Sequence, residues 1–259
     1  MSSELDLTGK VAIVTGGTKG VGRGVATRFL DAGAHVVICS RNDPEELPRS
    51  GDREALFVQA NVRDIDQIDK VIAFALDKFG RLDVLVNNAG GAPFALAATA
   101  SPRFTASIID LNLTAPMNFS QRANAVMQKQ DTGGSIINIA SVSGIRPSPG
   151  TAAYGAAKAG LLSLTQSLAV EWAPKVRVNA ITAGLIRTEQ SHLHYGDEAG
   201  IAAVSATVPM GRMGDPSDVA DVCLFLASPL ARYVNGASIL MHGGGERPAF
   251  LDAAKQAAK

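Results

Sequence analysis

The stretch Thr15-Gly16-Gly17-Thr18-Lys19-Gly20-Val21-Gly22 decides the fold of this chain. An apolar run at 11–15 leads into it, and a helical pattern at 20–32 follows. Glycine permits a tight turn and the close approach of a bound group, and a helix N-terminus favours an anion. The G-x-x-x-G-x-G spacing is neither the generic G-x-G-x-x-G pattern nor a P-loop. A glycine-rich loop between a strand and a helix therefore predicts a binding site for a pyrophosphate group.

Apolar strands and longer helical patterns alternate along the rest of the chain. Strands are predicted at 11–15, 35–40, 55–59, 84–87, 135–140, 176–181 and 238–241. Helices are predicted at 20–32, 64–79, 102–130, 151–172 and 216–227. This alternation indicates βαβ units and a parallel sheet that helices cover on both faces. The expected fold class is α/β: a single Rossmann-type, doubly wound domain over 1–259, with about seven strands.

Composition excludes several classes of protein. Hydrophobic residues make up 46% of the 259 residues, which indicates a packed core and excludes disorder. Lys and Arg number 24, as do Asp and Glu, so there is no basic excess for a nucleic-acid partner. Apolar runs stay shorter than the roughly 18 residues of a membrane span. We therefore expect a small-molecule substrate, with neither nucleic acid nor membrane as partner.

The cysteines and the N-terminus point to a reducing compartment. Cys39 and Cys223 are far apart and have no CxxC spacing, so neither a disulfide framework nor a zinc site is expected. His192 and His194 have no third metal ligand nearby in the sequence, so no metal is predicted. The first residues carry neither the basic region nor the apolar region of a secretory signal. The expected location is cytoplasmic.

One long segment interrupts the alternation of strands and helices. Residues 185–214 are mixed in character and include His192, His194 and Tyr195. In open α/β sheets, ligands bind beyond the carboxyl ends of the strands, where such segments gather. We therefore expect 185–214 to form a substrate loop that acts as a lid.

Tyr154, Lys158 and Ser141 form a plausible acid–base group. Tyr154 and Lys158 are four positions apart in a predicted helix, so their side chains share one face. A free phenol has a pKa of about 10, which is too high for a base at neutral pH. A neighbouring ammonium lowers that pKa, so the tyrosine can exchange a proton with a carbonyl oxygen. Ser141, at the end of a strand, can donate a hydrogen bond to the same oxygen.

Further motifs accompany this group in a fixed order. They are Asn87-Asn88-Ala89-Gly90, Asn112 within Asp110-Leu111-Asn112-Leu113, Ser141 thirteen positions before Tyr154 (154 − 141), Tyr154-Gly155-Ala156-Ala157-Lys158, and the closing 211–216 and 234–236. Together with the glycine loop, they resemble the short-chain dehydrogenase/reductase family over residues 7–245. The resemblance implies an oxidoreductase that interconverts a ketone and a secondary alcohol with a nicotinamide cofactor. Its implied catalytic residues are Asn112, Ser141, Tyr154 and Lys158.

The resemblance also assigns roles to residues that the pattern alone leaves open. It implies that Lys158 binds the nicotinamide ribose and that Asn112 holds a water in a proton relay. The implied cofactor-binding residues are Gly16, Thr18, Lys19, Gly20, Val21, Gly22, Ser40, Arg41, Asn61, Val62, Asn88, Ala89, Gly90, Tyr154, Lys158, Ile186 and Thr188. The chain departs from the family at Ala183-Gly184, where Pro-Gly is usual. Loss of that proline loosens a turn but removes no reactive group.

The end of the second predicted strand indicates which cofactor is used. NAD-selective enzymes place an acidic residue there to bind the adenosine ribose hydroxyls. This chain has Ser40 at that position and Arg41 directly after it, with Lys19 in the glycine loop. These groups suit a 2′-phosphate, which predicts NADP(H) in preference to NAD(H). Asp43 contacts the ribose instead if the strand ends a few residues later.

The substrate is less well specified than the reaction. Apolar residues at 91–98 and 204–213 favour a hydrophobic substrate, such as an acyl thioester or an alicyclic ketone. One alternative is a 3-oxoacyl-carrier-protein or acyl-CoA reductase. The helix ends at 128–130 and 171–174 offer one basic residue for docking an acidic carrier, which weakens this alternative. A second alternative, a non-catalytic cofactor-sensing protein, conflicts with the intact Ser141, Tyr154 and Lys158.

Assembly is the last expectation from the sequence. In the family that the chain resembles, the two long helices pack against those of a second subunit. Ala156, Leu161, Leu164 and Leu168 are more apolar surface than one sheet face can bury, so a homotetramer with paired two-fold interfaces is expected.

Overall fold

A parallel sheet of seven strands forms the centre of the computed structural model, which describes residues 4–246. Its strand order is β5-β2-β1-β6-β7-β8-β9, and every neighbouring pair is parallel. The strands are β1 (Val11–Thr15), β2 (His35–Ser40), β5 (Leu56–Gln59), β6 (Val84–Asn87), β7 (Gly134–Ser141), β8 (Val176–Ala183) and β9 (Ser238–Met241). This confirms the predicted α/β doubly wound fold. The ends of the predicted domain, 1–3 and 247–259, lie outside the described residues.

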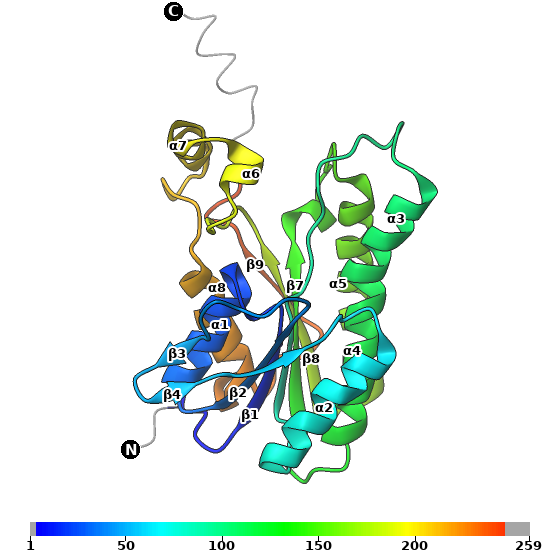
Figure 1. Ribbon diagram of the computed structural model, residues 1–259, viewed down its shortest axis with the longest axis vertical. Coiled ribbons are helices and arrows are strands. Elements are labelled where there is room, and N and C mark those ends of the chain that lie inside the picture. Colours follow the sequence, from blue (N-terminus) through cyan, green and yellow to red (C-terminus); the bar gives the residue numbers. More distant parts are fainter. Residues whose placement is uncertain (1–3, 247–259) are drawn as a thin grey trace, which may run out of the picture.

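Helices cover both faces of the sheet (Figure 1). The helices are α1 (Gly20–Asp31), α2 (Ile65–Phe79), α3 (Pro102–Ile109), α4 (Ala115–Met127), α5 (Ala152–Trp172), α6 (His192–Tyr195), α7 (Glu198–Thr207) and α8 (Pro216–Ala227). A small hairpin, β3 (Arg49–Ser50) with β4 (Arg53–Glu54), follows β2. Among the described residues, no helix is long and apolar enough to cross a membrane.

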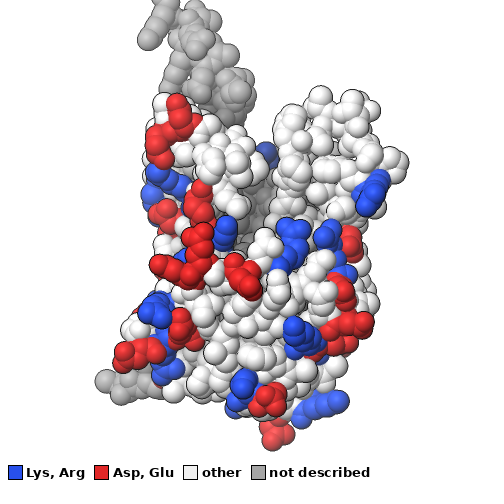
Figure 2. All heavy atoms as spheres, in the orientation of Figure 1, with Lys and Arg blue, Asp and Glu red and all other residues white. Residues whose placement is uncertain are grey.

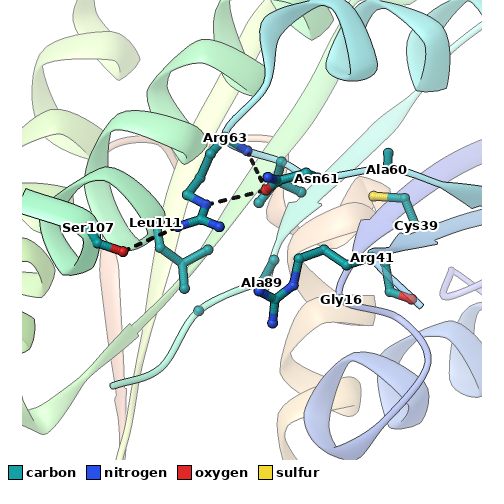
Figure 3. A pocket seen from close by; sticks show the side chains of 12 residues that line it. Gly16, Cys39, Arg41, Ala60, Asn61, Arg63, Ala89, Ser107 and Leu111 are labelled. Atoms are coloured by element: carbon teal, nitrogen blue, oxygen red, sulfur yellow. Dashed lines mark hydrogen bonds between the residues drawn. The ribbon is translucent and has the colours of Figure 1, made fainter. Parts of the chain in front are cut away.

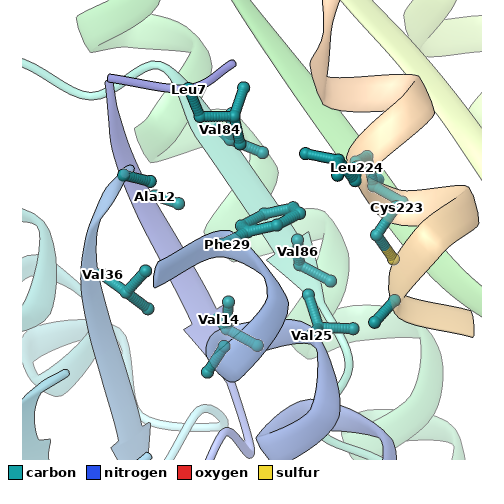
Figure 4. Close-up of a cluster of buried hydrophobic side chains, with 14 of the residues drawn as sticks. Leu7, Ala12, Val14, Val25, Phe29, Val36, Val84, Val86, Cys223 and Leu224 are labelled. Carbon is teal, nitrogen blue, oxygen red and sulfur yellow. The ribbon is translucent and has the colours of Figure 1, made fainter. Parts of the chain in front are cut away.

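The alternation of side chains along β1 explains the two layers of core. Ala12 and Val14 pack with α1 and α8, where Phe29 lies in the middle of the cluster (Figure 4). Val11 and Ile13 pack on the opposite face, in the cluster that also contains residues of α2, α4 and α5. Because both faces are buried, the strand is apolar throughout, as parallel strands usually are.

The order in which the chain adds strands to the sheet reverses between β1 and β6. From β1 the chain proceeds through β2 to β5 at one edge, and then returns to β6 on the other side of β1. Parallel strands present their carboxyl ends at one edge, so the loops after β1 and β6 adjoin each other there. A crevice at this point is where doubly wound proteins bind their ligands.

The structure differs from the sequence expectations in three segments, the first being the unpredicted hairpin of β3 and β4. The predicted helix at 102–130 is interrupted by a π-helical turn at Asp110–Thr114, which separates α3 from α4. The predicted lid at 185–214 contains the helices α6 and α7. The strand and helix bounds elsewhere agree with the prediction within about two residues, the usual uncertainty of helix ends.

The exposed apolar residues of α5 are not the leucines that the sequence analysis named for a subunit interface. Leu161 and Leu168 are buried within the subunit, where they pack in its own core, so they provide no free interface. Val170 on α5 is instead 82% exposed, and Leu240 on β9 is 48% exposed. Tyr233, shortly before β9, is fully exposed.

Candidate active site

The glycine loop between β1 and α1 is built around close backbone contacts. Gly16 has a φ of +64°, a conformation that favours glycine. A Cβ on Gly22 would lie 2.3 Å from the carbonyl oxygen of Gly16, so a side chain there would displace the loop. A Cβ on Gly17 would lie 2.4 Å from Cγ2 of Ile38. These contacts explain three of the glycines in the sequence motif.

Hydrogen bonds join this loop to the segment after β6. The Thr15 hydroxyl oxygen accepts from the N–H groups of Asn88 and Ala89, both at 3.0 Å. The side-chain amide of Asn88 donates to the carbonyl oxygens of Thr15, at 2.9 Å, and of Gly16, at 3.2 Å. Asn88 thus braces the two loops, and its side-chain N–H group is engaged by the protein.

A cavity of about 320 Å³ opens at the carboxyl ends of β1, β2, β5 and β6 (Figure 3). It is lined by Gly16, Cys39, Ser40, Arg41, Ala60, Asn61, Val62, Arg63, Ala89, Gly90, Ser107 and Leu111. Seven of these residues belong to the cofactor set expected from the sequence. The structure therefore brings together the residues expected to contact the adenosine half of a dinucleotide.

Arg63 also lines this cavity, and the sequence analysis did not identify it. Its backbone N–H and Nε both donate to Oδ1 of Asn61, at 3.2 and 3.3 Å. Its Nη1 donates to the Ser107 hydroxyl oxygen at 3.2 Å, which ties the cavity to α3 (Figure 3). Its position directly after Asn61-Val62 is the sequence feature that could have identified Arg63.

A second cavity, of about 710 Å³, lies beside the glycine loop. Its charged lining residues are Lys19, Arg23, Arg41, Asp43, Glu45, Glu46 and Glu189. Arg23 and Glu46 form an ion pair at 3.3 Å. The Ser40 hydroxyl donates to the carbonyl oxygen of Asn42 at 2.5 Å, so its proton is already engaged. Thr18 lines this cavity too.

The surface above the sheet is divided by a cleft. In Figure 2, this cleft separates the lobe that carries α6 and α7 from the lobe that carries α3, and basic side chains lie along its lower margin. Charges of both signs are present around it. The cleft gives ligands access to the carboxyl ends of the strands.

Lys158 is buried on α5, one helical turn after Tyr154. Its Nζ donates to the carbonyl oxygen of Ile139 at 2.7 Å and lies 5.6 Å from the centre of the Tyr154 ring. Burial lowers the pKa of Lys158 from 10.5 to about 8, because the charged ammonium loses its hydration. Lys158 therefore stays mainly protonated at neutral pH and places a positive charge near the phenol.

Tyr154 and Ser141 meet at the end of β7. Burial raises the pKa of Tyr154, and hydrogen bonding to Ser141 opposes this rise. The Ser141 hydroxyl oxygen also accepts from the backbone N–H of Ser143 at 3.2 Å, which orients it. The direction of this shift is opposite to the lowered pKa expected from the sequence, because burial of the phenol outweighs the effect of Ser141 and Lys158 Nζ lies 5.6 Å from the ring centre.

Asn112 lies in the π-helical turn and is fully buried. It donates to the carbonyl oxygens of Gly91, at 3.0 Å, and Ile108, at 2.9 Å, and accepts from the Gly91 N–H at 2.9 Å. A Cβ on Gly90 would lie 2.7 Å from Oδ1 of Asn112 and 3.4 Å from Nζ of Lys158. The absence of a side chain at Gly90 thus lets Asn112 and Lys158 approach the same point of the backbone.

Ile186 and Thr188 lie at the start of the lid. Ile186 forms an isolated parallel bridge with Gly214, which closes the base of the lid. The methyl carbon of Thr188 lies 3.2 Å from where a Cβ of Gly20 would stand, so the lid contacts the glycine loop. At the Ala183-Gly184 departure, the Gly184 N–H donates to Met241 O at 2.8 Å, which supports the turn. Among the described residues, no group of His, Cys, Asp or Glu is placed to hold a metal ion.

Comparisons with known proteins agree on the class of reaction. The profile of a family described as enoyl-(acyl carrier protein) reductase matches residues 16–246. A 3-oxoacyl-[acyl-carrier-protein] reductase of Synechocystis sp. is 37% identical over 247 residues, which cover 92% of this chain and 97% of that protein. An L-rhamnose 1-dehydrogenase (NAD(P)(+)) of Azotobacter vinelandii is 36% identical over 249 residues, with 92% and 97% covered.

A solved structure is similar over almost the whole chain. It is the ligand-free aldohexose dehydrogenase of Thermoplasma acidophilum, with a TM-score of 0.86 and 32% identity. The match covers 94% of this chain and 96% of that one. All three proteins are named as reductases or dehydrogenases, but their names give different substrates.

Proposed function

The chain belongs to the short-chain dehydrogenase/reductase family, and on that premise we propose that it is an NADP(H)-dependent enzyme that interconverts a ketone and a secondary alcohol. The family itself acts on CH–OH or keto groups with NAD(P). The observation that carries the proposal is the buried Lys158 ammonium one turn from Tyr154, whose ring centre lies 5.6 Å from Nζ.

The residues of this site divide the work of the reaction. The hydride that reaches or leaves the carbonyl carbon would come from, or go to, a nicotinamide cofactor held by the glycine loop and Lys158. Tyr154 gives its phenolic proton to the carbonyl oxygen in reduction, and recovers a proton in oxidation. Ser141 donates a hydrogen bond to that oxygen as charge develops on it. Lys158 stabilises the phenolate that Tyr154 becomes.

Asn112 has a positioning role in this proposal. Its side chain is occupied by Gly91 and Ile108, so it holds the loop after β6 beside Lys158. The proton relay that the family resemblance implies then uses water near this buried turn. Such a relay returns a proton to Tyr154 after each reduction and removes one after each oxidation.

The residues of the two cavities suit a dinucleotide. We place the adenosine half in the cavity of Asn61, Val62, Ala89 and Gly90, and the pyrophosphate at Gly20, Val21 and Gly22. Lys158, Ile186 and Thr188 then face the nicotinamide end. Lys19 and Arg41 line the cavity where a 2′-phosphate extends, which supports the NADP(H) preference. Because the Ser40 hydroxyl donates to Asn42, we attribute the preference for NADP(H) to Lys19 and Arg41.

The substrate in our proposal is a hydrophobic ketone or alcohol. Large apolar side chains are exposed on the segments that follow β6, β7 and β8: Phe94, Leu96, Ile145, Leu193 and Met210. The name of the Synechocystis relative keeps a 3-oxoacyl thioester as a second candidate. We further propose that the chain is one domain with 185–214 as its substrate loop, and that it works as a cytoplasmic homotetramer. The single seven-stranded sheet supports the first of these points.

A substrate panel tests this function. Acetoacetyl thioesters, steroids, sugars and simple cyclic ketones are each assayed for NADPH and NADH oxidation, and the matching alcohols for the reverse reaction. We expect turnover with at least one ketone–alcohol pair, and a higher kcat/KM with NADPH. Cofactor binding without turnover across the panel, in a protein whose Tyr154→Phe variant behaves identically, favours the cofactor-sensing alternative.

A further inference from the structure

Glu189, at the start of the lid, contacts the first residue of α1. Its Oε1 accepts a hydrogen bond from the backbone N–H of Gly20 at 2.9 Å, across 169 positions of sequence. The first N–H groups of any helix have no acceptor within the helix, and the helix dipole favours negative charge there. The first turn of α1 contains no acidic residue of its own. Glu189 therefore supplies this helix with its anion from a distant segment.

The same N–H group belongs to the loop that our proposed function assigns to the cofactor pyrophosphate. We propose that Glu189 competes with the pyrophosphate for the N-terminus of α1 and thereby sets the affinity for the cofactor. A carboxylate oxygen and a phosphate oxygen cannot both accept the single Gly20 proton, and their negative charges repel each other. This inference rests on the proposed function, because it needs the dinucleotide to bind at this loop.

Hydrogen bonds join the residues on either side of Glu189 in a turn. The backbone N–H of Thr188 donates to the Ser191 hydroxyl oxygen at 2.9 Å, and Nδ1 of His192 lies 3.0 Å from the carbonyl oxygen of Glu189. The Thr188 methyl also contacts the glycine loop. When a phosphate takes the Gly20 N–H, Glu189 moves away, and the turn that holds Thr188 adjusts with it. Cofactor binding is thereby coupled to the start of the substrate loop.

Glu189 differs from the other charged residues of the same cavity in the group that it contacts. Glu45 also lines this cavity, but the contact with the Gly20 N–H is made by Glu189. Lys19 and Arg41 act on the 2′-phosphate, which NADP has and NAD lacks. The pyrophosphate is common to both cofactors. Loss of the Glu189 charge must therefore raise the affinity for NADH as well as for NADPH.

The test compares dissociation constants of purified Glu189→Gln, Glu189→Ala, Glu45→Gln and wild type, measured by titration calorimetry. The ligands are NADPH, NADH and adenosine 2′-monophosphate, which lacks the pyrophosphate. We expect both Glu189 variants to bind NADPH and NADH about two- to fivefold more tightly, the effect of one charge at a helix terminus. The constant for adenosine 2′-monophosphate should change less than those for the dinucleotides, and Glu45→Gln should shift the dinucleotide constants less than the Glu189 variants do.

Equal or weaker dinucleotide binding by both Glu189 variants overturns the inference, as does an equal gain in Glu45→Gln. If the wild type binds neither NADPH nor NADH, the proposed function fails instead. The two failures are therefore distinguishable in one experiment.

Discussion

Asn112 and Gly91 are joined by a reciprocal pair of hydrogen bonds. The side-chain carbonyl of Asn112 accepts from the Gly91 N–H at 2.9 Å, while its amide donates to the Gly91 oxygen at 3.0 Å. The π-helical turn presents Asn112 for this contact, and π-helical turns often occur at functional sites. The pair fixes the loop after β6 beside Lys158.

The first prediction concerns this pair. Asn112→Ala removes the side-chain hydrogen bonds to the partly buried backbone of Gly91 and to the carbonyl oxygen of Ile108, so the free energy of unfolding should fall by about 1–3 kcal/mol. Activity should fall as well, because the loop beside Lys158 loses its anchor. Urea unfolding and kcat measure the two effects. Asn124→Ala is the control, since Asn124 lies on α4 and pairs with Gln128 away from the site. Unchanged stability in Asn112→Ala contradicts the anchoring role.

The second prediction concerns the buried charge of Lys158. Burial lowers its folded-state pKa from 10.5 to about 8, so between these pH values the unfolded chain binds more protons than the folded one. The contribution of Lys158 to stability must then rise with pH across this window. The free energy of unfolding of the wild type should therefore increase relative to Lys158→Met between pH 8 and pH 10.

Urea unfolding of both proteins at several pH values measures this difference. Lys129→Met is the control, because Lys129 is exposed on the surface and should show no such trend. A constant difference between wild type and Lys158→Met across the window contradicts the lowered pKa.

The third prediction concerns cofactor selectivity. Charge-assisted contacts contribute roughly 1.5–3 kcal/mol each, so the Lys19→Ala, Arg41→Ala double variant should lose most of its preference for NADPH. The ratio of kcat/KM for NADPH to that for NADH measures this. Arg23→Ala is a matched control, because Arg23 lines the same cavity but is paired with Glu46. An unchanged ratio in the double variant contradicts the assignment of the 2′-phosphate to Lys19 and Arg41.

The fourth prediction concerns assembly. Val170 and Leu240 expose apolar surface on α5 and β9, and Tyr233 is fully exposed nearby. Light scattering at micromolar concentration should give about four times the chain mass of 26.8 kDa. A monomeric mass contradicts the tetramer. Val170→Glu should weaken the assembly, whereas Leu161→Ala should act on the stability of the subunit, since Leu161 is buried in its own core.

The sequence predicts most of the fold because parallel strands buried on both faces are continuous apolar runs, as at β1 and β7. It also predicts the acid–base group, since Tyr154 and Lys158 are neighbours on one helix. It does not predict the π-helical turn, where Asn112 contacts Gly91, because a local sequence pattern does not indicate a contact across 21 positions. The sequence does not predict the contact of Glu189 with Gly20 either, since the two residues are 169 positions apart.

The central claim is that Tyr154 is the proton donor and acceptor of a hydride-transfer reaction. Tyr154→Phe keeps the ring and its packing but removes the transferable proton. The direct measurement is the single-turnover rate of NADPH oxidation with a ketone substrate, at saturating cofactor, in wild type and Tyr154→Phe. We predict a rate lower by orders of magnitude with cofactor affinity retained. A variant that keeps more than about a tenth of the wild-type rate contradicts the account, because a general acid typically contributes at least 10²-fold.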